Sequence, residues 1–203
     1  AITNTYTYGL IAIVIIVILG MFIAYISTRR KNALTSVIDT ITMFPYIIPG
    51  SVLGITLLLA FNKKPLALSG TFVIIIIAYV VRRLPYTLRS SAAILYQISP
   101  SMEEASISLG YSPVKTFFKV TAVMMLPGVF AGAILSWITT INELSSSVIL
   151  YTGSTKTLSV SIYTEVIRAS YGTAAALSTI LTVTTVISLL IFFKVSGSKE
   201  ISL

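Results

Sequence analysis

The chain has 203 residues, of which 56% are hydrophobic and only 10% are charged. Soluble domains carry about 25% charged residues, so this composition argues against a soluble protein. The sequence has no cysteine and no histidine, which excludes disulfides, thiol nucleophiles, zinc sites built on these residues and histidine proton relays. The net charge of +8 does not predict nucleic-acid binding, because the basic residues stand at the ends of apolar runs, where membrane orientation signals occur.

Several apolar stretches approach or exceed the length that crosses a bilayer as a helix, which is about 20 residues. We therefore expect an all-α membrane protein that forms a single domain over residues 1–203. Residues 142–172 are too polar to span, and we expect them to form an outer loop with a partly buried or re-entrant piece. The predicted spans are residues 6–26, 34–61, 66–88, 120–141 and 173–193.

Proline residues interrupt two of these predicted spans. Pro45 and Pro49 lie in the second span, which should therefore be bent or broken near its middle. Pro127 interrupts the fourth span in the same way. Broken helices of this kind line substrate paths in transporters. Two glycine pairs have the spacing that lets neighbouring helices approach closely: Gly50 with Gly54, and Gly128 with Gly132.

The distribution of basic residues favours an N-terminus outside the membrane and a C-terminus in the cytoplasm. If residues 29–31 are cytoplasmic, the alternating spans place ten basic residues on that side and four outside, as the positive-inside rule predicts. The outer four are Lys63, Lys64, Lys156 and Arg168. The inner ten are Arg29, Arg30, Lys31, Arg82, Arg83, Arg89, Lys115, Lys119, Lys194 and Lys199.

A short polar segment on the predicted cytoplasmic side separates the third and fourth spans. Ser101 and Glu104 have the S-x-x-E spacing of a capping box. Gly110 is a natural helix stop, because glycine accepts the left-handed conformation that follows a helix. Ser112-Pro113 then restarts a helix, with serine as the cap and proline in the first turn. The sequence therefore predicts a helix at residues 101–110, a tight turn and a second helix.

The predicted helix at residues 101–110 needs a partner that stabilises it. Helices shorter than about 12 residues are marginal in water, and Glu103 and Glu104 would be costly in lipid. A weakly apolar face with carboxylates on its flank suits insertion into a cleft of another protein. This face contains Met102, Ala105 and Leu109, with Ser106 beside them.

The stretch EEASISLGYSPVKTFFKV resembles the EAA loop of binding-protein-dependent ABC transporter permeases. In the family pattern, E-A-A is followed by three residues, a glycine, nine residues, an aliphatic residue, one further residue and Leu-Pro. The Leu-Pro pair is displaced here by four residues, to Leu126-Pro127. The other pattern positions are occupied by Glu104, Ala105, Ser106, Gly110 and Val120.

The resemblance implies a type I importer permease core of about five transmembrane helices in a bacterial-type inner or plasma membrane, with a cytoplasmic coupling helix at residues 101–110. Two cores would pair, as copies or as halves of a fused chain, and a start without methionine fits either a second half or a trimmed subunit. The coupling residues would be Ser101, Glu103, Glu104, Ala105, Ser106, Leu109 and Gly110.

The same resemblance implies the partners and where the chemistry takes place. The coupling helix would dock on a cytoplasmic ABC ATPase dimer, which would bind ATP and Mg²⁺. This chain would bind no cofactor and would have no catalytic site of its own. An extracytoplasmic solute-binding protein would deliver the cargo.

Residues after the fourth span, beginning INELSSSVILYTG, resemble the corresponding part of ferric-iron permeases, whose relatives carry sulfate, thiamine, polyamines or phosphonates. A carboxylate suits a hard cation such as Fe³⁺, and it would also suit a polyamine or another cation. Glu143 is therefore a candidate path residue and metal ligand, and Ser145 is a further candidate path residue. The alternative is that Glu143 caps a turn or pairs with a basic residue at the membrane interface. Arg82 and Arg83 are either path-lining charges or interfacial anchors.

Other classes of function remain open on the sequence alone. An ATP-independent transporter or channel is one, although the span cores lack the acidic or histidine chain that couples ions, and Asp39 is the nearest candidate. A structural subunit that anchors a soluble complex is another. An enzyme is disfavoured because Glu103 and Glu104, adjacent on a helix, diverge by about 100° and cannot share one substrate as acid and base.

Overall fold

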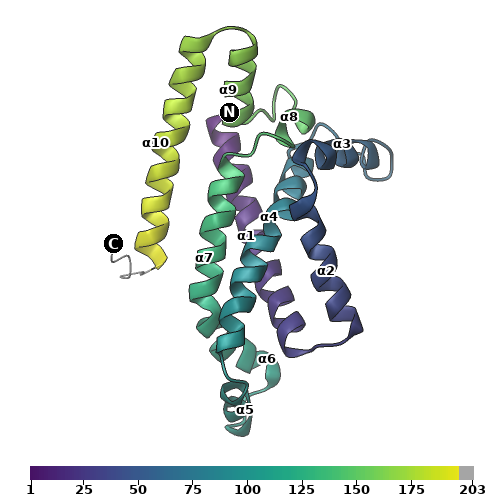
Figure 1. Cartoon of the computed structure of the whole chain (residues 1–203), viewed down its shortest axis with the longest axis vertical. Helices are drawn as coiled ribbons and strands as arrows, with labels where there is room; N and C mark the ends of the chain where they lie inside the picture. The colour runs from purple at the N-terminus through teal and green to yellow at the C-terminus, as the bar shows by residue number, and fades with distance from the viewer. Residues whose placement is uncertain (197–203) are drawn as a thin grey trace.

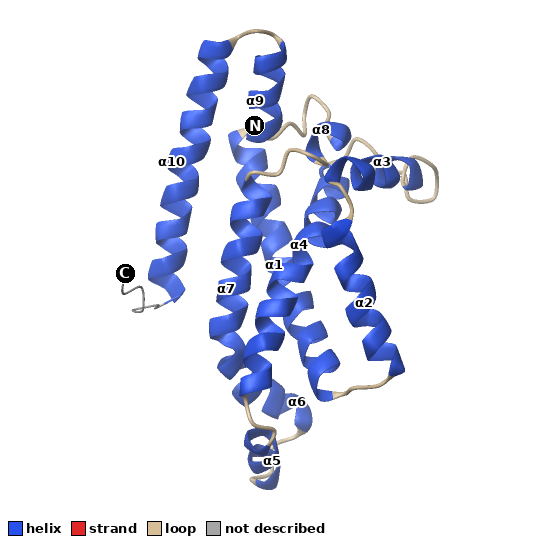
Figure 2. Cartoon of the chain, viewed as in Figure 1, coloured by secondary structure: helices blue, strands red, loops and turns tan. Residues whose placement is uncertain are grey.

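The computed structural model describes residues 1–196, which form helices joined by loops with no strand in that range (Figure 2). The central helices are α1 (Ile2–Arg29), α4 (Phe72–Gln97) and α7 (Ala122–Ile141). They run side by side along the long axis, and α4 packs extensively against both others (Figure 1). The flanking helices are α2 (Ala33–Ile47) on one side and α10 (Tyr171–Ser196) on the other (Figure 1).

Three helices are long and apolar enough to cross a membrane, and the bent pair of α2 and α3 (Gly50–Ala60) would make a fourth. The three are α1, the continuous helix Pro113–Ile141 and α10. The α4 helix has 26 residues but carries three arginines, which keep it out of this group. It lies at the centre of the bundle, where neighbouring helices supply partners for its charges, as intramembrane charges require.

The third predicted span, residues 66–88, was wrong at both ends. Residues 61–71 form a turn in which the Leu68 N–H donates to the Phe61 carbonyl at 2.9 Å. The helix starts only at Phe72, and it continues beyond the arginines to Gln97. The start differs because residues 61–71 form the turn, and the end differs because a helix inside a bundle can continue past charges that find partners there.

The second predicted span is broken near its middle, as its prolines indicated. The α2 helix ends at Ile47, α3 begins at Gly50, and their axes differ by 111°. Pro49 stands at the break, and Ile48 is extended, as expected for a residue that precedes proline. Pro45 lies inside α2 without ending it. As a result, α3 turns across the end of the bundle (Figure 1).

The fourth predicted span is a continuous helix through Pro127, so no break occurs there. It is preceded by α6 (Pro113–Thr116) and the π-helical turn η1 (Phe117–Thr121). The glycine pair of α7 faces α4 at close range. A Cβ atom at Gly132 would lie 2.5 Å from Thr87 Cα, and one at Gly128 would lie 2.7 Å from the Ser90 carbonyl. The two backbones can approach because neither glycine has a side chain.

The predicted outer loop contains two short helices, α8 (Ser147–Leu150) and α9 (Leu158–Ile167). They lie at the end of the bundle where α1 begins (Figure 1). Leu150 and Leu158 are buried, so this segment is folded against the core. The α9 helix packs on α10, which otherwise lies at the edge of the bundle.

We predict that Gly132→Ala lowers the stability of the protein by about 1–3 kcal/mol, because the added methyl group would overlap the backbone of α4 at Thr87. Gly172→Ala is the matched control, since a Cβ there has no neighbour within 4 Å. Denaturant unfolding in detergent micelles would measure both variants. Equal stability of the two would contradict the close approach of α7 to α4.

Candidate functional site

A short helix, α5 (Ser101–Ser108), stands at the end of the bundle opposite α8 and α9 (Figure 1). The predicted capping box is absent, because Ser101 is already the first helical residue and follows the N-cap Pro100. The Glu104 N–H donates to the Pro100 carbonyl at 3.1 Å. The hydroxyl that accepts from the helix start belongs to Ser99, at 3.3 Å from the Ser101 nitrogen. The helix therefore begins at the predicted residue, but without the predicted side-chain cap.

The end of α5 follows the sequence prediction. Gly110 has a φ of +93°, a conformation that glycine adopts without the strain of a side chain. Ser112 then caps α6, where its hydroxyl accepts from the Lys115 N–H at 3.3 Å, and Pro113 stands in the first turn. The result is a helix–turn–helix hairpin that projects from the bundle.

The side chains of α5 divide into a bound face and a free face. Ser106 is 6% exposed, and its hydroxyl bonds to that of Thr116 at 3.0 Å. Glu103 forms a 2.8 Å ion pair with Arg29 of α1. Beside Ser106 on the helix lie Met102, Ala105 and Leu109, which are all exposed and are here called the α5 face.

Two of the residues predicted to take part in coupling, Glu103 and Ser106, lie outside the exposed α5 face. Glu103 attaches the hairpin to α1, and Ser106 joins α5 to α6 within the hairpin, whereas Glu104 is exposed. Leu109 is 83% exposed, a high value for a leucine in a helical hairpin. The exposed apolar surface has no covering element in the described part of the chain, so it suits contact with a second protein.

A second group of polar residues lies within the bundle, where α4 meets the start of the outer loop. Glu143 is 4% exposed, and its carboxylate pairs with Arg82 at 2.6 Å and with Arg83. The Ser146 N–H and hydroxyl also donate to the same carboxylate, at 3.0 and 3.2 Å. Glu143 thus both pairs with basic residues and caps a turn, which is the structural alternative considered for it.

This arrangement leaves little of the Glu143 carboxylate for a cation. Both oxygens accept from arginine, and residues 1–196 contain no group of three or more acidic, histidine or cysteine side chains that could hold a metal. Ser145 is exposed nearby and lies against Gly50 of α3. The side chains of Arg82 and Arg83 are 15% and 13% exposed, and both are partners of a buried acid.

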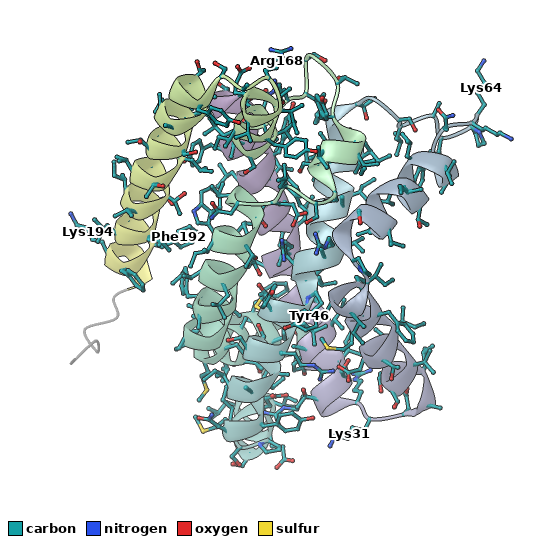
Figure 3. All side chains as sticks on the ribbon, turned by 45° about the horizontal axis from the view of Figure 1, so that its top comes forward. Lys31, Tyr46, Lys64, Arg168, Phe192 and Lys194 are labelled. Carbon is teal, nitrogen blue, oxygen red and sulfur yellow. The ribbon has the colours of Figure 1, made fainter. Side chains whose placement is uncertain are left out.

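Sequence reasoning missed a cavity of about 350 Å³ between α2, α4 and α7. Tyr46 of α2 and Tyr86 of α4 meet there in an edge-on contact, with ring centroids 5.7 Å apart. Tyr46 is labelled in Figure 3, which shows it between the two helices. The lining is mostly apolar, and Leu135 of α7 completes it. The sequence feature that the three helices around this cavity share is an internal proline: Pro45, Pro85 and Pro127.

The described part of the chain is thus a bundle of helices, several of them apolar enough to cross a membrane, with an exposed hairpin at one end. The family of binding-protein-dependent transport system inner membrane components matches residues 7–197, and the chain belongs to this family.

Individual relatives differ in the solutes that their names give. The chain is 33% identical over 198 residues to a ferric transport system permease protein of Actinobacillus pleuropneumoniae, and this match covers 98% of the chain and 29% of the relative. It is 28% identical over 162 residues to a spermidine/putrescine transport system permease homologue of Mycoplasma genitalium, covering 79% and 57%. The chain spans 24–34% of the length of three ferric transport relatives that it matches.

Solved structures share the fold at low sequence identity. A bacterial ABC transporter involved in the import of alginate superimposes with a TM-score of 0.78 at 14% identity, covering 98% of this chain and 79% of that one. A methionine ABC transporter in inward-facing conformations gives a TM-score of 0.75 at 17% identity, covering 97% and 91%. These likenesses show that the chain has the fold of an ABC importer permease.

We predict that Glu143→Gln destabilises the protein by about 3–5 kcal/mol, because it leaves the charges of Arg82 and Arg83 buried without a counter-charge. The matched control is Glu165→Gln, which breaks an ion pair with Arg168, a side chain that is 66% exposed. That change should cost less than about 1 kcal/mol. The free energy of unfolding in detergent measures both, and a similar small loss in the two variants would contradict a structural role for Glu143.

Proposed function

We propose that this chain is a transmembrane core of an ATP-driven importer and that its cargo is ferric iron. The observation that carries the importer proposal is the exposed α5 face on a hairpin that projects from the end of the bundle. The iron proposal is supported by the 33% identity to a ferric transport permease over nearly the whole chain.

The proposed partners follow from the same hairpin. A cytoplasmic ABC ATPase dimer would receive the α5 face, and the ATPase would hold ATP and Mg²⁺ and hydrolyse the nucleotide. A second permease core, a copy or a tandem half, would complete the path by packing beside this one. An extracytoplasmic binding protein would deliver the solute, and nucleic acid has no part in this function.

The proposed orientation places the N-terminus outside and α5 in the cytoplasm, because α1 begins at the end opposite to α5 (Figure 1). Three of the ten basic residues assigned to the inner side are omitted from the comparison of loop charges. Arg82 and Arg83 lie inside the bundle, and Lys199 lies outside the described residues. Figure 3 shows Lys31 at one end and Lys64 and Arg168 at the other. The remaining basic residues still favour the α5 end, by seven to four, in agreement with the positive-inside rule.

A different solute is the alternative within the same function, because relatives named for polyamine, aminoethylphosphonate and molybdate or tungstate transport also match. The arginine-bound state of Glu143 presents no free carboxylate to a cation. The choice of iron therefore rests on the relatives and not on a visible iron ligand.

We predict that a cysteine at Leu109 forms a crosslink with a cysteine in the partner groove of the ATPase, and that ATP changes its yield. The chain has no native cysteine, so the introduced thiol is the only one it contributes. Ser106→Cys is the control, because Ser106 is buried only three residues away. No crosslink from Leu109→Cys, with both proteins present in the membrane, would contradict the ATPase-coupled function.

The cargo is tested by uptake of radioactive ferric iron into membrane vesicles that contain the complete transporter and its binding protein. We predict ATP-dependent iron uptake that excess unlabelled ferric iron abolishes and excess spermidine or aminoethylphosphonate does not. Uptake of one of the latter two solutes in place of iron would reject the iron assignment and leave the importer function intact.

A further inference from the structure

An arginine at the end of α1 connects the hairpin to the bundle. The Arg29 Nε atom donates to Glu103 at 2.8 Å, and one of its Nη atoms donates to the carbonyl of Ile98 at 2.8 Å. Ile98 caps the end of α4, and Glu103 lies in the first turn of α5. One planar guanidinium therefore connects α1, α4 and α5, a geometry for which its fixed fork of donors is suited.

This attachment is shielded from water and reinforced by aromatic contacts. The side chains of Arg29 and Glu103 are each 14% exposed, so their ion pair is screened less than a surface pair would be. The Tyr25 hydroxyl donates to the second Glu103 oxygen at 3.2 Å, and its ring meets the ring of Phe117 edge-on with centroids 4.7 Å apart. Movement of α5 would therefore pull on α1 directly.

The other end of α1 is attached in a similar way to the outer loop. The Asn4 side-chain amide donates to the carbonyls of Ser154 and Lys156, at 2.9 and 3.0 Å. The Thr5 hydroxyl accepts from the Leu158 N–H at 2.8 Å, which holds the start of α9. Both ends of this helix thus have polar bonds to segments far away in the sequence.

The body of α1 is suited to transmit displacement between these ends. Its 28 residues span about 42 Å at 1.5 Å per residue. Ala12, Ile16 and Ala24 are fully buried against the core, and Gly20 lies against the backbone of α4. A helix packed this closely moves as a unit, because packed interiors deform little.

We propose that Arg29 and Glu103 are positioning residues that pass the movement of α5 to α1, and that Asn4 passes it on to the outer loop. The proposal rests on the proposed function, in which an ATPase moves α5. It assigns the two adjacent glutamates different tasks: Glu103 connects the hairpin inward, and Glu104 remains on the side that the ATPase approaches.

The test compares Arg29→Lys, Glu103→Gln and Asn4→Ala in the complete transporter, with solute uptake and ATP hydrolysis measured in the same vesicles. Lysine keeps the charge but loses the fork that reaches both Glu103 and Ile98. Each variant should lower solute transported per ATP hydrolysed by roughly threefold or more and weaken the stimulation of hydrolysis by the binding protein. Arg30→Lys is the matched control, because Arg30 is the adjacent exposed arginine, and its ratio should not change.

A variant that only destabilised the protein would lower uptake and hydrolysis together and leave their ratio unchanged. An unchanged ratio of solute transported to ATP hydrolysed in Arg29→Lys and Glu103→Gln would overturn the proposal. A reduced ratio in those two variants with a normal ratio in Asn4→Ala would also overturn it, because the outer loop would then not be connected to α5 through α1. The Leu109→Cys crosslink is measured in each background. If the crosslink persists in the Arg29→Lys background, the ATPase is still docked there and the changed ratio reports on coupling. If the crosslink is absent from the parent transporter, the proposed function itself has failed.

Discussion

Pairing of charges inside an apolar bundle is the constraint on which the rest of this structure depends. An unpaired charge costs several kcal/mol in such surroundings, so each acid within the bundle determines which helices lie next to one another. Glu143 fixes the start of the outer loop against α4 through Arg82 and Arg83, and Ser146 completes its bonds. The same α4 helix also reaches α2 through an exposed pair, Arg89 with Asp39 at 3.0 Å, whose side chains are 50% and 31% exposed.

The same rule acts at the α5 end of the bundle, where it separates an attached carboxylate from an exposed one. Glu103 is turned into the protein because Arg29 and Tyr25 satisfy its carboxylate there. Glu104 and Leu109 are consequently left outside, on a hairpin whose own helices are too short to be stable alone. The attachment of Glu103 and the bond between Ser106 and Thr116 hold the hairpin in place, so that the exposed α5 face is presented in a defined orientation.

The sequence predicted features that depend on local chemistry and missed those that depend on tertiary partners. The stop at Gly110, the cap at Ser112 and the break before Gly50 follow from backbone preferences of glycine, serine and proline. The start of α4 and the burial of Ser106 do not, because both are decided by residues distant in the sequence. The residues next to Glu143 in the sequence do not indicate that it pairs with arginines of α4. A basic partner was one of the two alternatives that the sequence left open for this residue.

The use of Glu143 as a structural counter-charge bears on how such a core handles its solute. In the proposed function, a passing cation would find no free oxygen on Glu143, because both carboxylate oxygens are engaged by arginine. Conduction requires binding that is weak enough to release the solute, so the lack of a tight site in the described residues is compatible with transport. Relatives named for ferric iron, polyamine and molybdate or tungstate transport all match this chain. A buried acid that serves as a counter-charge would not restrict such a core to one of these solutes.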